Sequence, residues 1–336
     1  MAIETVHLKN FSLFSDLTLK AVPGVNVIIG ENGTGKTHIL KAIYMGSLQY
    51  STFDIAELTK FFPMKEGTEL LGKNQKDVAL VEISTSKDDK KKKMAAKLVK
   101  VNMAGSNRPN ISCTYEIVLP CSISQAVYIP VKDMLTHSKG ILEMAEKYRG
   151  FPFDKTLLDI VRIAKRLPLK QPPELAQTIL PKLEAMIDGT VDYEDDEFFV
   201  RKHDGRKVNF SIEAEGFKKI GLLWQLLMNE SITPGSVLLW DEPDANLNPK
   251  FLPTLVDCLL ELSRHGVQIF LGTHSYLLAK YFDVKKSKED SLKFCSLFFE
   301  SGNINCEVGE TFIDLKHNAI LKTFDDLVEV VYGSQM

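Results

Sequence analysis

The segment Gly30–Thr37 constrains the fold of this chain more than any other stretch. Its sequence, GENGTGKT, matches the pattern G-x-x-x-x-G-K-[ST]. The apolar run Val25–Ile29 before it is typical of a buried strand, and His38–Tyr44 after it is typical of a helix. A strand, a glycine-rich turn and a helix in this order predict a loop whose backbone N–H groups converge on a polyphosphate. A glycine-rich surface turn that binds nothing is the alternative interpretation.

The parts of this loop have different predicted tasks when ATP is the ligand. Glycines let the backbone turn toward the phosphates, and the following helix adds the positive end of its dipole. Lys36 is expected to bridge the β- and γ-phosphates, and Thr37 is expected to supply a hydroxyl ligand to Mg²⁺. The residues predicted here to bind the nucleotide are Gly30, Asn32, Gly33, Thr34, Gly35, Lys36 and Thr37.

Length and charge narrow the class of protein. The 336 residues fit one large or two ordinary globular domains. A formal net charge of −3 gives no overall attraction to nucleic acid, so DNA or RNA contact would require a local basic patch. The basic run Lys90–Lys93 adjoins Asp88 and Asp89, which favours a solvated hairpin tip over a DNA-contacting loop.

The N-terminus and the cysteines favour a cytoplasmic location. The chain starts without the charged and apolar regions of a signal peptide, and no stretch approaches 18 consecutive apolar residues. We therefore expect no membrane partner. The cysteines are odd in number and contain no C-x-x-C pair, which fits reduced thiols. They are Cys113, Cys121, Cys258, Cys295 and Cys306.

Apolar periodicity divides the chain into three expected parts. Residues 1–130 combine the phosphate loop with an antiparallel patch of strands, 131–207 form a helical insertion, and 208–336 return to alternating strands and helices. This alternation predicts an α/β fold with parallel strands. Smaller expected elements are patch strands at 78–84, 97–102 and 113–119, and a hairpin at 197–212 whose Asp204-Gly205 turn is preferred to a metal site at His203.

Two further groups of polar residues follow buried strands in the third part. Asp241 and Glu242 end the strand 236–240, and His274 follows the next apolar strand. Because the carboxyl ends of parallel strands meet at one edge of a sheet, these side chains are expected beside the phosphate loop. Asp241 would then bind Mg²⁺ together with Thr37. Glu242 would orient or deprotonate the attacking water, and His274 would sense the γ-phosphate, whereas an isolated acidic pair would be a solvated strand end.

With these motifs in this order, the chain resembles the ABC-type ATPases of the AAA-15/AAA-21 group, which are related to SMC heads, RecF and the OLD nucleases. The resemblance covers nearly the whole chain. It implies a P-loop NTPase of the α/β class, with an ABC/SMC-like head, an antiparallel β patch and an inserted helical lobe. The motifs that carry it are Leu8–Phe11, Gly30–Thr37, Asp241–Pro249 and Gly272–Ser275.

The resemblance also implies a head-to-head dimer, in which a signature helix from one subunit completes the nucleotide site of the other. The corresponding segment is Ala214–Lys219, in which Gly216 would approach the phosphates. An alanine stands first, where the family usually has serine, and Glu215 adds a carboxylate near an anion. An ordinary core helix is the alternative interpretation. The glutamine that reports nucleotide state in the family has two candidates, Gln75 and Gln125.

The function implied by the resemblance is that of an ATP-hydrolysing molecular switch. It would form a homodimer or a higher oligomer and control a separate effector protein, as similar ATPases do in anti-phage systems such as PARIS and Septu. A nuclease effector would be a separate chain, because nothing here resembles a TOPRIM or HNH site. Two alternatives stay open: a RecF- or SMC-like ATPase of DNA repair or maintenance, and a nucleotide-dependent interaction module with little turnover.

Overall fold

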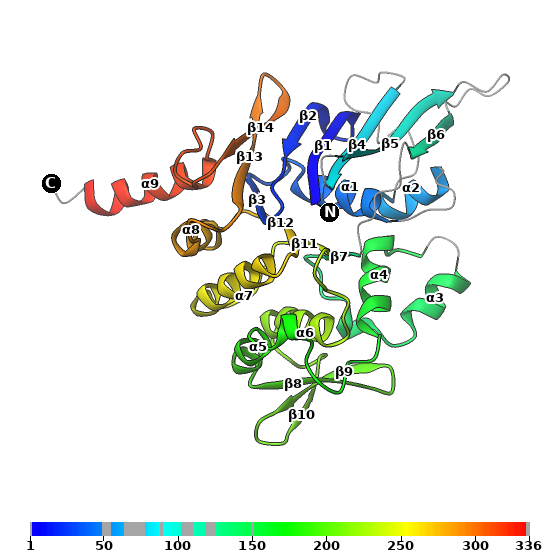
Figure 1. Cartoon of the computed structure of the whole chain (residues 1–336), viewed down its shortest axis with the longest axis vertical. Helices are drawn as coiled ribbons and strands as arrows, with labels where there is room; N and C mark the ends of the chain where they lie inside the picture. Colours follow the sequence, from blue (N-terminus) through cyan, green and yellow to red (C-terminus); the bar gives the residue numbers. More distant parts are fainter. Residues whose placement is uncertain are drawn as a thin grey trace.

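A six-stranded sheet forms the centre of the molecule (Figure 1). The computed structural model describes residues 2–48, 55–63, 78–87, 90–101, 110–117, 125–148 and 151–333. The strands of this sheet are β3 (Val25–Gly30), β7 (Ala126–Ile129), β11 (Val237–Asp241), β12 (Gln268–Thr273), β13 (Leu292–Glu300) and β14 (Asn303–Gly309). Their order is β14-β13-β3-β12-β11-β7, and every neighbouring pair is parallel except β13 and β14.

Alternate residues of the central strands face two separate hydrophobic cores. Val27 and Ile29 of β3 belong to one core together with Trp240 of β11, whereas Ile28 and Leu239 belong to the other. Because successive side chains of a strand point to opposite faces, a sheet covered on both sides needs apolar residues at nearly every position. The expected α/β fold with buried parallel strands is confirmed.

Helices cover both faces of the sheet. α1 and α2 pack into the core that contains Ile28, and α4 to α8 pack into the core that contains Val27. The short α3 follows β7 and contacts α4. The helices are α1 (Lys36–Ser47), α2 (Ile55–Phe61), α3 (Ile141–Lys147), α4 (Lys155–Ala164), α5 (Leu180–Ile187), α6 (Glu215–Met228), α7 (Leu252–Arg264) and α8 (Tyr276–Lys285), with 3₁₀ turns at Leu135–His137, Glu174–Ala176 and Pro249–Phe251.

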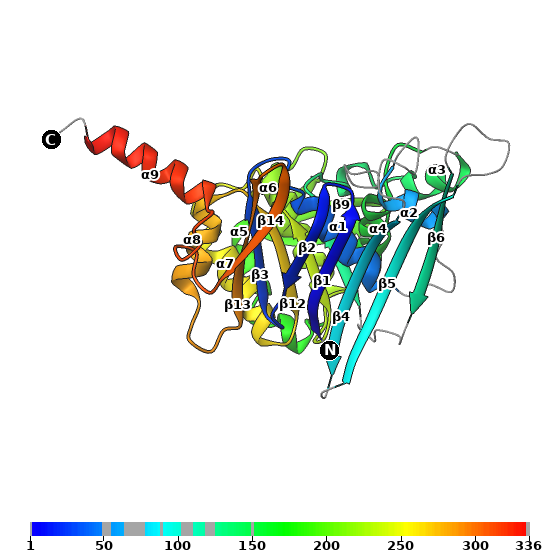
Figure 2. The same ribbon diagram turned by 90° about the horizontal axis from the view of Figure 1, so that it is seen from above.

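An antiparallel sheet of five strands lies beside α1 and α2 (Figure 2). In spatial order its strands are β2 (Phe14–Lys20), β1 (Ala2–Phe11), β4 (Val78–Lys87), β5 (Lys90–Val101) and β6 (Asn110–Ile117). The expected antiparallel patch is confirmed. The run Lys90–Lys93 starts β5 and pairs in register with Ser84–Lys87, the last residues of β4, so it lies at the end of the β4–β5 hairpin, in agreement with the expected position. The β4–β5 ladder thus extends through the lysine run.

The antiparallel sheet supports the phosphate loop through Phe14. This side chain is fully buried. Gly35, which precedes α1, has φ +89°, and a Cβ at this position would lie 2.5 Å from Phe14 Cζ. A side chain at position 35 would therefore meet both an unfavourable backbone conformation and the Phe14 ring. The loop and the first hairpin of the chain form one packed unit.

A third sheet lies under α6 (Figure 1). It is formed by β8 (Gly189–Glu194), β9 (Glu197–Lys202) and β10 (Lys207–Asn209). The expected hairpin is confirmed, since Lys202 N–H donates to Arg206 O at 2.8 Å and Gly205 has φ +87°. The predicted helical insertion therefore also contains a sheet, whose last strand starts at residue 207. The division of the chain at residues 130 and 207 stays a prediction.

The last helix, α9 (Ala319–Tyr332), extends away from the body (Figure 2). Its first turns are anchored: Phe324 stacks on Tyr276 of α8 with ring centroids 4.0 Å apart. Farther along, Leu327 is 58% exposed and Val330 is 71% exposed. Among the described residues, no helix is both long and apolar enough to cross a membrane.

The cysteines correct one expectation. The sequence predicts reduced thiols, but the structure joins Cys295 and Cys306 in a disulfide between β13 and β14. The two residues are only 11 positions apart, and the hairpin between them places their strands side by side. Cys258 is free and buried, Cys113 lies in β6, and Cys121 lies outside the described residues.

The support of the phosphate loop by Phe14 predicts a large loss of stability in Phe14→Ala. Removing a buried aromatic ring costs about 3–5 kcal/mol, which should appear as a lower midpoint of urea unfolding. The matched control is Phe299→Ala in β13, whose side chain is 50% exposed. That change should alter stability by about 0.5 kcal/mol or less. Equal midpoints for the two variants would contradict the role of Phe14.

Candidate functional site

The carboxyl ends of β3, β11 and β12 bring the polar motifs together. Thr37 Oγ1 donates a hydrogen bond to Asp241 Oδ2 at 2.6 Å. Glu242 N–H donates to Gly272 O at 2.8 Å, and Glu242 Oε1 lies 2.9 Å from His274 Nδ1. Segments far apart in the chain thus meet at one edge of the central sheet. The roles assigned to these side chains stay predictions.

Lys36 lies inside the phosphate loop. Its side chain is 6% exposed, and Nζ donates to Gly30 O at 2.7 Å and to Glu31 O at 3.0 Å. Burial lowers the pKa of Lys36, and the negative charges of Glu242 and Asp241 oppose that shift. The ammonium group is therefore held close to the centre of the loop and to the acidic pair, where an anionic ligand would meet it.

Asp241 is buried, with 2% exposure, and accepts two hydrogen bonds on one oxygen. The donors to Oδ2 are Thr37, and Tyr128 of β7 at 3.4 Å. Burial raises the pKa of Asp241, the charge of Glu242 raises it further, and the two hydrogen bonds and Lys36 oppose the rise. A hydroxyl and a carboxylate are oxygen donors of the kind that Mg²⁺ prefers. This pair fits a magnesium site, because a divalent cation would favour the charged carboxylate.

Glu242 differs from Asp241 in both exposure and backbone conformation. Its side chain is 21% exposed and reaches His274, which is 51% exposed, so both groups are accessible to a ligand. Its φ of +47° lies in the left-handed region, which costs a residue other than glycine on the order of 1–3 kcal/mol. Thr273 Oγ1 holds the following turn by donating to Asp244 Oδ1 at 2.9 Å. The surrounding contacts thus maintain a strained conformation at the predicted catalytic residue.

Gly216 lies against the loop that follows the acidic pair. A Cβ at this position would come within 2.6 Å of Asn246 O and 2.9 Å of Leu247 Cα. Gly216 is therefore in backbone contact with this loop of its own chain. Ala214 is the N-cap of α6 and is exposed, as an element that meets a second subunit must be. The completion of a partner's nucleotide site by this helix stays a prediction.

Two residues at the site were missed in the sequence. Tyr128 donates to Asp241, and no motif marks it. Lys219 Nζ donates to Glu242 O at 2.8 Å, a contact that no motif predicts. The neighbouring Lys218 pairs instead with Glu215, and its Nζ lies 2.6 Å from Glu215 Oε1. Two adjacent lysines on one helix therefore point to different partners.

The structure does not bring Gln125 to the site. This residue precedes β7, and its carbonyl accepts a hydrogen bond from Val237 N–H at the start of β11. It thus lies at the amino edge of the parallel strands, whereas Asp241 and the phosphate loop lie at the carboxyl edge. The other candidate glutamine, Gln75, lies outside the described residues.

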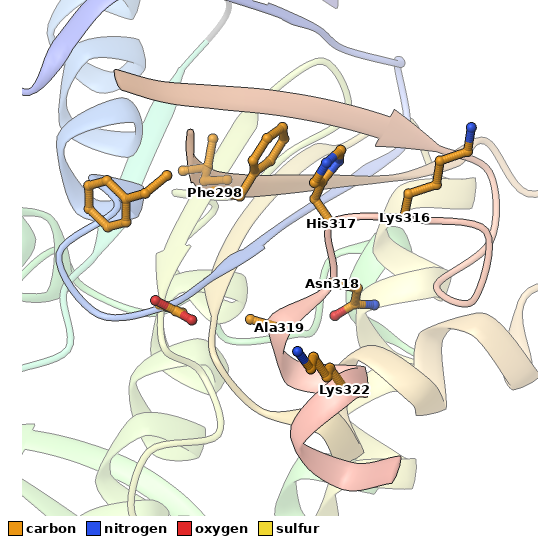
Figure 3. Close-up of a pocket in the computed structure, with 9 residues that line it drawn as sticks. Phe298, Lys316, His317, Asn318, Ala319 and Lys322 are labelled. Carbon is orange, nitrogen blue, oxygen red and sulfur yellow. The ribbon is translucent and has the colours of Figure 1, made fainter. Parts of the chain in front are cut away.

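A cavity of about 250 Å³ flanks the phosphate loop (Figure 3). Glu31 borders it on the side of the loop, and the rings of Phe298 and His317 form a stack with centroids 3.9 Å apart. Two lysines, Lys316 and Lys322, also line the cavity. The full lining is Glu31, Leu297, Phe298, Phe299, Lys316, His317, Asn318, Ala319 and Lys322.

Comparison with known proteins gives matches over most of the chain. One family model, AAA_23, described as an AAA domain, matches residues 5–118. A second, AAA_21, described as "AAA domain, putative AbiEii toxin, Type IV TA system", matches residues 144–280. RecF proteins, named DNA replication and repair proteins, match over short segments. The Idiomarina loihiensis protein is 49% identical over 45 residues, and the Staphylococcus aureus protein is 41% identical over 63 residues.

Solved SMC heads share the fold along nearly the whole chain. The head domain from Thermotoga maritima has a TM-score of 0.52 at 18% identity and covers 93% of this chain and 100% of its own. A head from Pyrococcus furiosus, bound to the C-terminal domain of ScpA, has a TM-score of 0.56 at 14% identity and covers 98% and 99%. Another head, bound to the winged-helix domain of ScpA, has a TM-score of 0.59 at 16% identity and covers 94% and 100%.

The two AAA-domain models, the RecF segments and the fold shared with SMC heads together support an SMC- and RecF-like P-loop ATPase. The sequence-based recognition of this group and of an SMC-like head is thus confirmed. The matched segments span 13% and 17% of the length of the two RecF relatives. These comparisons therefore support shared motifs and do not extend to the whole activity of RecF.

The phosphate-loop assignment predicts that Lys36→Ala abolishes tight ATP binding. Loss of the cation that pairs with a buried phosphate charge should weaken binding by about 2–5 kcal/mol, by analogy with truncated charge pairs. Isothermal titration calorimetry measures the affinity. The control is Lys41→Ala in the same helix, because Lys41 Nζ pairs with Asp154 at 2.7 Å outside the loop. Unchanged affinity in Lys36→Ala would remove the phosphate-loop assignment.

Proposed function

We propose that this SMC-like ATPase binds and hydrolyses ATP and acts as a molecular switch that dimerises through its nucleotide sites. The observation that carries the proposal is the hydrogen bond between Thr37 and Asp241, next to the pair Glu242 and His274. A phosphate loop alone requires only phosphate binding. A loop joined to an accessible carboxylate and imidazole has the groups that hydrolysis requires.

In this proposal each group has one task. The loop N–H groups and Lys36 bind the phosphates, and Thr37 with Asp241 would hold Mg²⁺, which supplies positive charge to the reacting phosphates when bound. The accessible carboxylate of Glu242 accepts a proton from the attacking water or orients it. His274 contacts the same carboxylate and is placed to donate a ring N–H to a phosphate oxygen.

The second part of the proposal is that the chain acts in the cytoplasm and controls a separate effector protein in anti-phage defence. It is supported by the description of the AAA_21 model, which names a toxin of a toxin–antitoxin system. The two solved heads that are bound to ScpA domains support a protein partner in general. Identification of the protein that co-purifies with the chain tests this part. A chain that purifies without a second protein would count against it.

A RecF- or SMC-like role in DNA repair or maintenance is the second candidate, favoured by the RecF matches. The two functions differ in the signal that the ATPase receives. Hydrolysis measured with and without duplex DNA separates them, because a DNA-repair ATPase should be stimulated by DNA. A chain that binds ATP without releasing phosphate would instead be a nucleotide-dependent interaction module.

Glu242→Gln should preserve ATP and Mg²⁺ binding and lower hydrolysis by about 10²-fold or more. The amide keeps the size of the side chain and removes its ability to accept the proton. Phosphate release under single-turnover conditions measures the chemical step, and calorimetry measures ATP affinity. Undiminished turnover would transfer the role of the base to another residue.

ATP should drive self-association in the Glu242→Gln variant, because bound nucleotide shifts the equilibrium toward the assembled state. Ala214 provides a matched test, since it caps α6 and is exposed. Ala214→Ser and Ala214→Asp both improve the helix cap, but only aspartate adds an anion next to the partner's phosphates. Serine should strengthen the ATP-driven increase in mass, and aspartate should abolish it.

Light scattering with and without ATP measures this association in the three proteins. Identical behaviour of the serine and aspartate variants would contradict the approach of α6 to a partner's nucleotide. A mass for the Glu242→Gln protein that does not change with ATP would contradict the composite site altogether.

A further inference from the structure

Lys219 occupies an unusual place for a lysine. It lies in the second turn of α6, its side chain is only 5% exposed, and its Nζ donates to the main-chain carbonyl of Glu242 at 2.8 Å. Burial lowers the pKa of Lys219, and the charges of nearby carboxylates, with Asp244 first, oppose the shift. A buried ammonium group requires such partners, because removing a charge from water is otherwise unfavourable.

The carbonyl that Lys219 contacts belongs to the strained residue of the site. Glu242 has φ +47°, and its N–H is held by Gly272 O. Lys219 holds the other side of the same residue, through its carbonyl oxygen. The peptide units on both sides of Glu242 are therefore fixed, and with them the direction in which its carboxylate leaves the backbone.

α6 touches the acidic loop at a second point. At Gly216, close packing against Asn246 and Leu247 leaves no room for a Cβ. Between Gly216 and Lys219 the helix turns once, so both contacts lie at the start of α6. The start of this helix and the loop from Glu242 to Leu247 thus form one packed unit.

We propose that Lys219 is a positioning residue for Glu242 and links the start of α6 to the catalytic carboxylate of the same chain. It acts through the backbone of Glu242 and does not itself touch the substrate. The inference rests on the proposed ATP hydrolysis. When a partner's nucleotide contacts the start of α6, a displacement there reaches Glu242 through the Lys219 ammonium group. Engagement of one nucleotide site would in this way adjust the other.

Lys219→Met tests the proposal, because methionine keeps the apolar length of the side chain and removes the donor. A small misplacement of a catalytic group lowers rates by about 10²-fold. We expect single-turnover hydrolysis to fall by about 10- to 100-fold, while ATP affinity changes by about twofold or less. Lys219→Arg keeps a cationic donor and should recover part of the lost rate.

A matched control lies away from α6. Lys286, at the C-cap of α8, is a partly buried lysine that pairs with Asp283 and whose Nζ also donates to a main-chain carbonyl, that of Glu310. Lys286→Met removes the same kind of hydrogen bond away from the acidic loop, and hydrolysis should stay within about twofold of the unmodified protein. Thermal unfolding of each variant shows whether the protein remains folded.

A double mutant separates positioning from general damage. If Lys219 acts through Glu242, adding Lys219→Met to Glu242→Gln should leave the residual rate within about twofold, because residues that act as a unit are not additive. A further 10-fold loss in the double mutant would overturn the proposal, as would full turnover in Lys219→Met. Failure of the unmodified protein to hydrolyse ATP would instead refute the proposed function.

If Lys219→Met does not fold, the arginine variant decides. A folded Lys219→Arg protein with a hydrolysis rate at or near that of the unmodified protein supports a requirement for the cationic donor. A folded Lys219→Arg protein with no more activity than Glu242→Gln would overturn the proposal, because the donor and its charge are still present.

Discussion

The hydrogen bond from Thr37 to Asp241 joins two residues that are 204 positions apart, and the order of the central sheet makes it possible. β12 lies between β3 and β11 and is parallel to both, so the carboxyl ends of these three strands lie side by side. Tyr128 reaches the same carboxylate from β7, on the other side of β11. A carboxylate with 2% exposure is tolerated there because hydrogen bonds and the nearby Lys36 favour its charged form. The strand order of the central sheet therefore also determines the electrostatic surroundings of Asp241.

The parts of the fold that depend on short, continuous stretches of sequence were predictable. The strand–loop–helix at Gly30–Thr37 and the buried strands with polar ends were predictable, because a parallel strand covered on both faces must be continuously apolar. The contacts of Tyr128 and Lys219, and the pairing of Cys295 with Cys306, were not. On a helix, one residue is rotated by about 100° from the next. Which of two adjacent lysines turns inward depends on how α6 packs, and no local pattern in the sequence contains that information.

The two sides of segment Ala214–Lys219 differ in their contacts. Its inner side contacts the same chain: Gly216 packs against Asn246 and Leu247, and Lys219 donates a hydrogen bond to Glu242 O. Its outer end, at Ala214, is exposed. α6 also packs on the small sheet β8–β10: a Cβ at Gly221 would lie 3.2 Å from Val191 of β8 and 2.9 Å from the ring of Phe210, which directly follows β10. In the proposed dimer, a helix that is held on two sides would transmit a displacement as a rigid body, and this would couple the two nucleotide sites.

The order of strands also has a consequence for synthesis of the chain. β3 carries the phosphate loop and is buried at all six positions, yet its two neighbours, β12 and β13, start at residues 268 and 292. At about 5–20 residues per second, the ribosome needs on the order of 10–50 s to reach them after β3 has been made. Throughout that interval an apolar strand has two unpaired edges, the condition that promotes aggregation. Shielding of the nascent Val25–Gly30 segment thus bears directly on the yield of active protein.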